Sequence, residues 1–573
     1  MKAAGTDTMK NEIKYEKSEL ELMTTYQLRE ICRREKIMNG VIHPLDKEEL
    51  IQTIMRYMGK RQDFLICDRK KGGEERVEEF LKNTRIVIKP SEELYCQSQI
   101  LAYEGLSIEY YDDYTIPYKK ELAGTNAFLM GSDKTLCAIL NLKEHGGKQE
   151  KLYLTKAAEL ETRETQRKDY RIFCMGRQTS ESLYHLYYGE HTILPEHIEV
   201  YSIPLIDFVV RKPVTLMLPM AIDFGSVNTT AGVYLDSAYF EHVGQQAAIK
   251  NCRENEINYT VFEDGAGESM LLPSVIGVLA VEEEDDKLLF GYDAIRLANA
   301  SYVDEGFCVF YDVKRWIGEY DKEEEIVDRQ GRRRLVKRAE ILRRFFLYII
   351  RKTENRFKCR ISQVHISSPV KQKHYFRRMF REILPEYMIN QEIMLDEGMA
   401  VLYNTISNML EQDTLEENEE YEALIIDCGG GTTDLCSYRF RIQDRRAAYK
   451  IYMETAYENG DTDFGGNNLT YRIMQILKIA LVRAKGNQNV SSVKEILEYM
   501  DTDIYRFIDS HGVKAFYQYL EQEYQKAEET LPTRFADFER YNRSEYYKVK
   551  NNFYTLFNTA EQIKKLFYGK VGA

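Results

Sequence analysis

The sequence predicts an α/β protein in three parts: a small helical hairpin module, a β-rich domain and a larger α/β domain. Its 573 residues suffice for about three domains, and 44% of them are apolar, which is typical of globular proteins. The hydrophobic pattern changes along the chain from helical spacing to short alternating runs, and then to strands that alternate with helices. We therefore place the three parts at residues 1–72, 85–210 and 216–573.

Residues 18–60 predict the helical hairpin. Apolar residues at helical spacing occur before and after a break that contains Gly40 and Pro44. The stretch resembles a SAP-type helix–loop–helix module, and relatives of that module often bind DNA. Residues 1–72 carry 15 Lys and Arg against 12 Asp and Glu, a balance of +3. Because phosphate contacts need several converging cations, weak DNA binding and a plain helical interaction module both stay open.

The β-rich part follows a charged segment, DRKKGGEERVEE (68–79), which we interpret as a linker. Runs such as RIVIKP, YTIPY, KLYLT and IEVYSIPLIDFVV alternate apolar and polar residues and predict antiparallel strands within 85–210. None of these runs carries a recognisable catalytic pattern.

Composition limits the cellular setting and the partners. The ten cysteines form no CxxC pair, so we expect free and mostly buried thiols. The N-terminus lacks the apolar stretch of a signal peptide, and no run approaches the roughly 18 apolar residues of a membrane span, so we expect a cytoplasmic protein without a membrane segment. The formal net charge of −13 argues against nucleic acid as the partner of the whole surface.

Two strand–turn–strand segments of the third part share one pattern. IDFGSVNTTAGVYL (222–235) and IDCGGGTTDLCSY (426–438) each contain a strand, an aspartate, one residue, a glycine, small hydroxyl residues and a second strand. Asp223 and Asp427 are 204 residues apart, which we interpret as an internal duplication. Tight glycine turns direct backbone N–H groups at an anion, hydroxyls add donors, and a strand-end aspartate can hold a divalent cation through its waters. Two facing turns of this kind predict a phosphate clamp.

These segments resemble the two phosphate motifs of the actin-like ATPase superfamily, whose fold is a duplicated ribonuclease-H-like domain. The finer match, over residues 218–570, is to the DnaK-type (heat shock protein 70) chaperone family. Six further segments occur in the order of that family's motifs: LLPSVIGVLA (271–280), LLFGYDAIRLAN (288–299), FYDVKRWIGE (310–319), MLDEGMAVLY (394–403), GDTDFGG (460–466) and NTAEQIKKLF (558–567). The resemblance implies a nucleotide-binding domain that uses ATP and Mg²⁺.

The resemblance also implies roles for individual residues. Lys314 would contact the γ-phosphate and the attacking water, Glu397 would position water or metal, and Asp427 is the third catalytic candidate. Asp223, Asp427 and Asp434 would organise Mg²⁺ through its water shell. The phosphates and the nucleoside would be surrounded by Asp223, Gly225, Ser226, Val227, Gly429, Gly430, Gly431, Thr432, Thr433, Gly465, Gly466, Glu561, Lys564 and Lys565.

Three positions depart from the family pattern, and two catalytic candidates have simpler explanations. Val227 replaces a hydroxyl residue, Gly398 replaces a proline, and Lys565 stands where arginine commonly stacks on adenine, which weakens stacking because an ammonium group is not planar. Taken without the family's motif order, Lys314 is better explained as an ordinary solvated surface cation, and that order reverses the preference. Glu397 is likewise explained as a carboxylate that complements a helix N-terminus.

From this resemblance we expect a chaperone-type ATPase that couples ATP hydrolysis to an unknown protein client or co-chaperone held by the N-terminal domains. A filament-forming actin-like protein and a sugar-kinase-like ATPase are the alternatives. After Gly466 the sequence contains no Gly-Gly pair and predicts no further strand. We therefore expect the C-terminal part of the domain to be incomplete, as a portion of a longer chain or one completed by a partner, with an uncovered apolar face and weak ATP binding.

Overall fold

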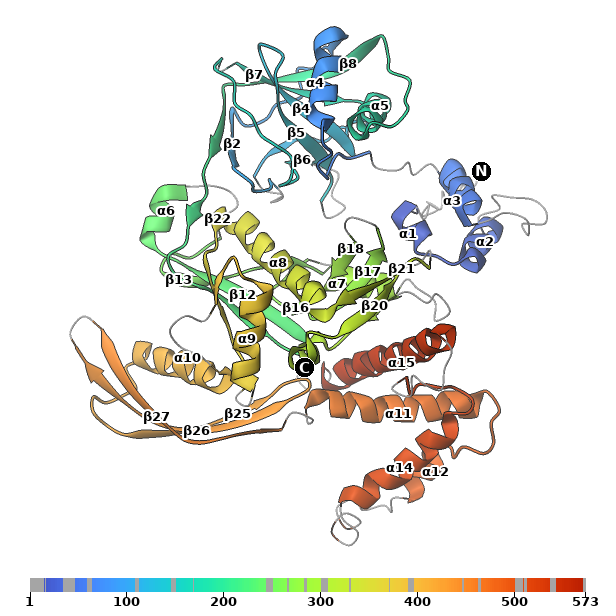
Figure 1. Ribbon diagram of the computed structural model, residues 1–573, viewed down its shortest axis with the longest axis vertical. Helices are drawn as coiled ribbons and strands as arrows, with labels where there is room; N and C mark the ends of the chain where they lie inside the picture. Colours follow the sequence, from blue (N-terminus) through green and yellow to red (C-terminus); the bar gives the residue numbers. More distant parts are fainter. Residues whose placement is uncertain are drawn as a thin grey trace, which may run out of the picture.

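The computed structural model is a mixed α/β structure whose elements run from α1 near the N-terminus to α15 near the C-terminus (Figure 1). It describes residues 15, 17–34, 47–58, 64–108, 113–145, 151–167, 169–243, 251–264, 267–282, 286–299, 308–328, 331–369, 372–389, 396–445, 448–461, 465–499, 506, 509, 513–535 and 543–569. The predicted break at 40–44 and parts of the segments MLDEGMAVLY and GDTDFGG lie outside the described residues.

The N-terminal module is a short helix followed by two longer ones: α1 (Lys17–Glu21), α2 (Thr25–Arg34) and α3 (Lys47–Met58). A reciprocal capping box fixes the start of α2, because Gln27 N donates to Thr24 Oγ1 (3.1 Å) and Thr24 N donates to Gln27 Oε1 (2.9 Å). The three helices share a small apolar core of their own. Leu22 packs against the cluster that contains Leu297 of α7 (Tyr292–Asn299), so the module contacts the third domain.

The β-rich domain is built on a seven-stranded sheet with the order β1-β8-β7-β4-β5-β6-β3. All neighbours in this sheet are antiparallel except β1 and β8, which are parallel. Every residue of β4 is buried, because alternate residues face apolar clusters on opposite sides of the sheet. The elements are α4 (Gly73–Asn83), β1 (Arg85–Lys89), β2 (Gln99–Tyr103), β3 (Thr115–Pro117), β4 (Thr125–Gly131), β5 (Leu136–Lys143), β6 (Lys151–Thr155), β7 (Tyr170–Met175), α5 (Arg177–Tyr188), β8 (His197–Leu205) and β9 (Asp207–Arg211), with β2 parallel to β9.

The segment interpreted as a linker belongs to this domain, so that prediction is wrong for its second part. Residues from Gly73 onward form α4, and Val77 and Leu81 are buried in the core of the β-rich domain. Ile66 is buried in the same core, and its N donates to Asn126 Oδ1 (2.8 Å). Glu75, Glu79 and Lys82 lie on the exposed side of α4, whereas Glu74 is buried and Arg76 donates to the carbonyl oxygens of Leu186 and Tyr187.

The first half of the third domain is a mixed sheet packed against α8 and α9. Its strand order is β13-β12-β11-β23-β24, with β16 also paired to β12. Strand β11 is antiparallel to β12 and parallel to β23, which is parallel to β24. Phe224 on β11 makes edge contacts with Phe346 of α8 and Phe380 of α9 in the main apolar cluster. The elements are β10 (Val214–Thr215), β11 (Met220–Phe224), β12 (Asn228–Leu235), α6 (Ser237–Val243), β13 (Glu256–Tyr259), β14 (Phe262–Glu263), β15 (Glu268–Ser269), β16 (Leu272–Pro273), β17 (Ile276–Ala280), β18 (Lys287–Phe290), β19 (Val309–Phe310), the 3₁₀ helix η2 (Val313–Glu319), β20 (Glu323–Val327), β21 (Arg333–Lys337), α8 (Arg338–Phe357), β22 (Cys359–Arg360), β23 (Gln363–Ile366), α9 (Lys373–Ile383) and β24 (Met388–Ile389).

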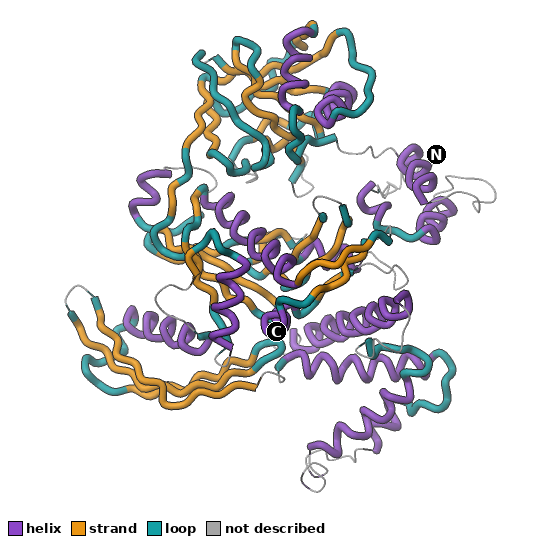
Figure 2. Tube along the Cα trace, in the orientation of Figure 1, coloured by secondary structure: helices purple, strands orange, loops and turns teal. Residues whose placement is uncertain are grey.

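The second half of the third domain begins with α10 (Glu397–Glu411) and a curved antiparallel sheet. Strands β25 (Tyr421–Cys428), β26 (Thr433–Asp444) and β27 (Tyr449–Asp461) pair in this order and curve along α10 (Figure 2). Helices α11 (Gly466–Ala484), α12 (Val493–Tyr499), α14 (Val513–Ala527) and α15 (Arg543–Gly569) follow. Helices α11 and α15 lie side by side and share an apolar cluster with α14.

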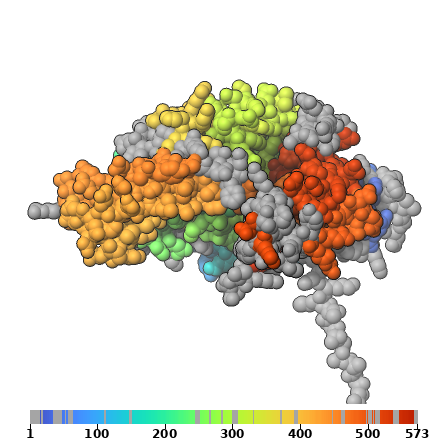
Figure 3. Space-filling view, turned by 90° about the horizontal axis from the view of Figure 1, so that it is seen from below, coloured from blue at the N-terminus to red at the C-terminus, as the bar shows by residue number. Residues whose placement is uncertain are grey.

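One face of the curved sheet is covered by α10 and the other is open to solvent. Cys436 and Tyr438 on β26 are buried against Leu402 of α10. On the opposite face of β25, Leu424 is 62% exposed and Ile426 is 64% exposed. In the view from below, the orange segment that contains β25, β26 and β27 forms part of the molecular surface (Figure 3). The sequence predicts such an uncovered apolar face, and in the described part of the chain no fourth strand joins this sheet.

Candidate functional site

The two aspartate–glycine hairpins have the same backbone geometry. In each hairpin the glycine N donates to the carbonyl oxygen three residues later: Gly225 N to Asn228 O (3.1 Å) and Gly429 N to Thr432 O (2.9 Å). The strand registers beside the two turns also match, with a constant offset of 204 residues. The duplication predicted from the sequence is therefore present in the hydrogen bonding of the two hairpins.

The two glycine turns lie in contact with each other. A Cβ atom added to Gly430 would lie 2.4 Å from Cγ2 of Val227, and one added to Gly431 would lie 3.1 Å from Oγ of Ser226. Only glycine at position 430 permits this approach, because any side chain would overlap Val227. Val227, which departs from the family pattern, thus fills the space beside Gly430 with a methyl group. A ligand between the turns requires them to move apart.

The turn before α11 packs on the second hairpin. Gly466 N donates to Gly429 O (2.9 Å) and Asn467 N donates to Gly430 O (2.6 Å). A Cβ atom added to Gly465 would lie 2.7 Å from each of these two carbonyl oxygens. The glycines that the resemblance assigns to the phosphates and to the nucleoside therefore lie together.

Lys564 of α15 reaches the same turn. Its Nζ donates to Thr470 Oγ1 (2.8 Å) and Gly466 O (3.3 Å), and it pairs with Glu561 Oε2 (2.6 Å). Burial opposes ionisation of Glu561, but hydrogen bonds from Lys564 and Thr470 hold its pKa below the usual value. Lys565 is exposed, and its charge also helps to lower the pKa of Glu561. Thr470 also belongs to this group, and the sequence analysis does not predict it as a site residue.

Two serines support the first hairpin from outside it. The backbone N of buried Ser274 donates to Val227 O (2.8 Å), and its hydroxyl donates to Gly225 O (2.7 Å). Ser367, at the end of β23, donates to Asp223 Oδ1 (2.8 Å). Neither serine is predicted as a site residue, although Ser274 lies within the segment LLPSVIGVLA.

Lys314 on η2 is buried and paired. Its side chain is 7% exposed, and its Nζ lies 2.9 Å from Oε1 of Glu397. The residue before η2, Asp312, has a φ of 54°, in the left-handed region that few non-glycine residues adopt. The explanation of Lys314 as a solvated surface cation is therefore wrong.

Glu397 occupies the first turn of α10, whose start is fixed by Asp396. Asp396 Oδ1 accepts from the helix backbone (2.6 Å) and from Tyr438 OH (3.1 Å), and Oδ2 pairs with Lys373 (2.7 Å). This capped start places Glu397 beside Lys314. The carboxylate can complement the helix dipole and pair with the lysine at the same time.

Near Lys314, four carboxylates lie close enough to influence one another: those of Asp223, Glu397, Asp427 and Asp434. Burial, followed by the charge of Asp223, raises the pKa of Asp427. Burial also raises the pKa of Glu397, with Asp223 and Asp434 adding to this rise and Lys314 opposing it. Lys314 acts on the carboxylates of Glu397, Asp427 and Asp312, while Asp223 and Asp434 add further negative charge, so the group carries a net negative charge when all are ionised. A bound cation would lower these pKa values.

Comparisons with known proteins assign this chain to no family: no protein-family model matches it, and no curated protein matches it significantly. Within the described residues, no group of three or more His, Cys, Asp and Glu side chains is close enough to hold a metal ion directly. None of the helices in the described ranges has both the length and the apolar composition that a bilayer span requires. All ten cysteines are free thiols, as predicted.

Proposed function

We propose that residues 216–569 form an ATP-binding domain of the actin-like type, similar to the nucleotide-binding domain of DnaK-type chaperones. The chain would couple ATP hydrolysis to a protein partner held by its N-terminal parts. The observation that carries this proposal is the buried pair of Lys314 and Glu397. These two catalytic candidates are 83 residues apart in sequence and meet beside the aspartates of the two matching hairpins.

The topology of the third domain supports the proposal. An antiparallel three-strand unit (β11, β12, β13) extended by parallel strands (β23, β24) is the arrangement expected of one half of a ribonuclease-H-like pair. Strands β25, β26 and β27 repeat the antiparallel unit after α10. Fold alone does not give a function, so the argument depends on the residues at the two hairpins.

The charges at the hairpins fit a divalent cation with a polyphosphate. Asp223, Asp427 and Asp434 would hold Mg²⁺ through water molecules, and the cation would favour the ionised form of Asp427, whose pKa burial and the charge of Asp223 raise. Mg²⁺, when bound, neutralises charge on the phosphates. Lys314 would neutralise the transferring phosphate, and Glu397 would orient the lysine and accept a hydrogen bond from water.

Helix α8 supports coupling between this site and the β-rich domain. At its first residue, Arg338 donates to Glu319 of η2 (3.0 Å). Near its last residue, Asn355 Oδ1 accepts from Ser107 N of the β-rich domain (2.9 Å). A single 20-residue helix therefore connects the segment that carries the catalytic lysine with the domain that would hold the partner.

The proposal is tested by comparing Lys314→Ala with Lys322→Ala. Lys322 lies just after η2 and is exposed, so it is a matched control. We expect the wild-type protein to be stabilised by Mg-ATP and to hydrolyse it. Lys314→Ala should keep the stabilisation but lose turnover by about 100-fold or more, while Lys322→Ala keeps both.

Equal turnover in the two variants, or no stabilisation of the wild-type protein by Mg-ATP, would refute the proposal. Sedimentation with and without ATP tests the filament-forming alternative. ADP release that depends on an added sugar tests the sugar-kinase alternative.

A further inference from the structure

The face of the β25–β27 sheet that points away from α10, here called the outer face, is open where the matching face of the first half is covered. With the offset of 204 residues between the two hairpins, Leu424 and Ile426 of β25 correspond to Met220 and Ile222 of β11. Met220 and Ile222 are 0% and 2% exposed, whereas Leu424 and Ile426 are 62% and 64% exposed. Apolar side chains of the same kind are therefore buried in one repeat and exposed in the other.

The free edge of β25 also matches an edge that is paired in the first half. There β23 lies parallel to β11, with Ile366 beside Ile222 in the register. Within the described residues, β25 pairs with β26 alone, so the backbone groups along its other edge have no strand partner. An edge of this kind can accept a strand from another polypeptide.

The first half shows what covers such a face. Helix α9 follows β23 and packs on β11, where the ring of Phe380 makes an edge contact with that of Phe224 (centroids 6.5 Å apart). The residue of β25 that corresponds to Phe224 is Cys428, which is exposed. A parallel strand and the helix after it therefore lie, in the first half, against the edge and the face that remain open on β25.

Charge indicates which kind of segment the open sheet would attract. Residues 416–461 carry 11 Asp and Glu against 5 Lys and Arg, a balance of −6. Residues 361–384, which contain β23 and α9, carry 5 Lys and Arg against 1 Glu, a balance of +4. A basic strand–helix segment of this kind would be attracted to the open sheet. The exposed glutamates at the start of β25 are Glu416, Glu417, Glu419, Glu420 and Glu422, of which the last pairs with Arg439 (3.0 Å).

We propose that the free edge and outer face of β25 bind a separate polypeptide, which adds a strand parallel to β25 and then a basic amphipathic helix over Leu424 and Ile426. The added strand would carry apolar residues at alternate positions, because successive side chains of a strand point to opposite faces of the sheet. Main-chain hydrogen bonds along the edge would supply affinity, and the apolar side chains would supply specificity. The surface does not depend on the proposed ATPase activity.

A peptide with the sequence of residues 361–384 is the probe, because it contains the strand and the helix in this order. We expect the dye-labelled peptide to bind the full chain saturably in fluorescence anisotropy titrations. A scrambled peptide of the same composition has the same charge and should lose saturable binding. No saturable binding of the first peptide, or equal binding of both, overturns the proposal.

Substitutions on the outer face locate the binding. Ile426→Thr keeps the β-branched shape and the net charge but removes apolar surface, so it should weaken binding of the peptide about tenfold or more. The control Leu335→Thr alters a similarly exposed side chain (61%) on β21 and should bind as the wild-type protein does. Ile426→Val keeps an apolar side chain and should retain binding. Equal binding by Ile426→Thr and Leu335→Thr contradicts the proposed surface.

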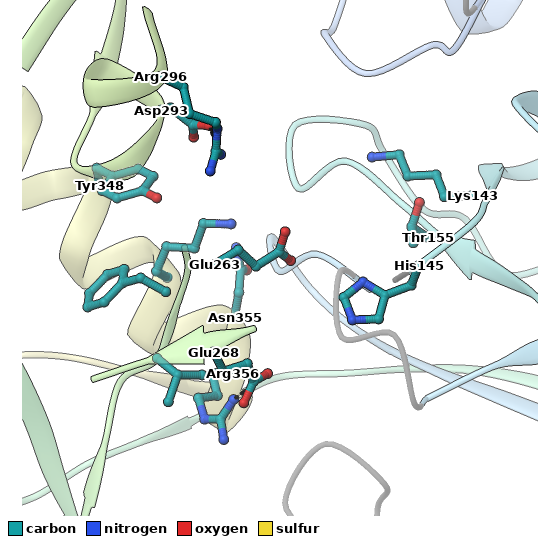
Figure 4. Close-up of a pocket in the computed structure, with 13 residues that line it drawn as sticks. Lys143, His145, Thr155, Glu263, Glu268, Asp293, Arg296, Tyr348, Asn355 and Arg356 are labelled. Carbon is teal, nitrogen blue, oxygen red and sulfur yellow. Dashed lines mark hydrogen bonds and ion pairs between the residues drawn. The ribbon is translucent and has the colours of Figure 1, made fainter. Parts of the chain in front are cut away.

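Hydrogen exchange identifies the edge that is used. The bound peptide should slow exchange in residues 421–428. Residues 348–356 should exchange as before, because they lie on the wall of a polar cavity between the β-rich domain and the third domain (Figure 4). Protection of another region without residues 421–428 overturns the proposal.

Sedimentation of the chain without peptide tests a second copy as the occupant. We expect no dimer that depends on the outer face. A dimer of the wild-type protein that is lost in Ile426→Thr would assign the surface to a second copy of the chain and would also overturn the proposal.

Discussion

The buried ion pair between Lys314 and Glu397 makes a stability prediction that is independent of any nucleotide. In Lys314→Met the stem of the side chain is retained beside Phe376, but the ammonium group is lost. The side chains of the pair are 7% and 12% exposed, so solvent can compensate little of the lost charge. Breaking a buried pair by removing one partner costs about 3–5 kcal/mol. We expect a loss of about 3 kcal/mol at pH 8.

The loss of stability in Lys314→Met should be smaller at pH 5.5 than at pH 8, and the direction of this pH dependence follows from the pKa of Glu397. Burial already raises this pKa, and removal of Lys314 raises it further while Asp223 and Asp434 remain. A carboxyl group with a raised folded-state pKa contributes stability at low pH that is lost as the pH rises through that pKa. The variant therefore recovers stability on acidification, by up to about 1.4 kcal/mol for each unit of pKa rise.

The single tryptophan of the sequence reports on this segment directly. Trp316 lies on η2, two residues after Lys314, between the Phe310 ring (centroids 5.0 Å apart) and the Arg338 guanidinium (5.3 Å). Urea unfolding followed by its fluorescence at pH 8 and pH 5.5 would measure both losses. Lys322→Met is the control, because its pair with Glu319 is exposed and solvent screens it. A loss equal to that of the control, or one that grows on acidification, would refute the reasoning.

Three further outcomes are expected. Asp427→Asn should abolish the rise in melting temperature caused by Mg-ATP, whereas the exposed Asp413→Asn should keep it; an equal rise in both contradicts the assignment of Asp427. Gly398→Ala should lower the free energy of unfolding in urea by about 1–3 kcal/mol, because the new Cβ would lie 2.8 Å from Cys436 Sγ. The control Gly318→Ala, whose Cβ would have nothing within 4 Å, should lower it far less. Equal losses in the two variants would contradict the close packing at Gly398. Deleting residues 1–60 should leave hydrogen exchange in β4 slow. Deleting residues 1–72 should speed this exchange, because only the longer deletion removes buried Ile66. Equal exchange rates in the two deletion variants would place Ile66 outside the core.

Strands and hairpins of this protein could be predicted because their signals are local. The alternating runs RIVIKP and KLYLT form β1 and β6, and the two aspartate–glycine turns form between the predicted strands. The sequence does not predict helix α4. Its buried residues Val77 and Leu81 are surrounded in the sequence by charged ones, so the apolar pattern of the helix is weak. The parallel pairing of β1 with β8 joins residues 112 apart, such as Arg85 and His197, and no local pattern encodes it.

The same distinction applies to the candidate site. Asp223 and Asp427 could be found because the pattern around them occurs twice. Ser367 and Thr470 could not, because each is an ordinary hydroxyl residue that becomes part of the site only where distant segments meet. The burial of Lys314 could not be predicted either, because its partner Glu397 lies 83 residues later, at the first residue of a helix.

Helix α15 determines where the two hairpins can separate to admit a ligand. Its N-terminal part is fixed to the first half of the domain, where Tyr547 donates to Glu325 Oε2 (2.8 Å) and Tyr554 stacks on Tyr311 at 4.4 Å. Its C-terminal part packs along α11, where Ala560 is fully buried.

Tyr547 and Ala560 in these contacts are 5% and 0% exposed, whereas Val227 is 36% exposed, so the contacts of α15 are the more costly to break. The halves should therefore turn about the Tyr311–Tyr554 contact and part at Val227. Glu397 stays attached to the first half, because its N donates to Ser368 O (3.2 Å), so an entering polyphosphate would offer Lys314 an anion in addition to Glu397. Binding of the proposed ligand would then favour the opened site.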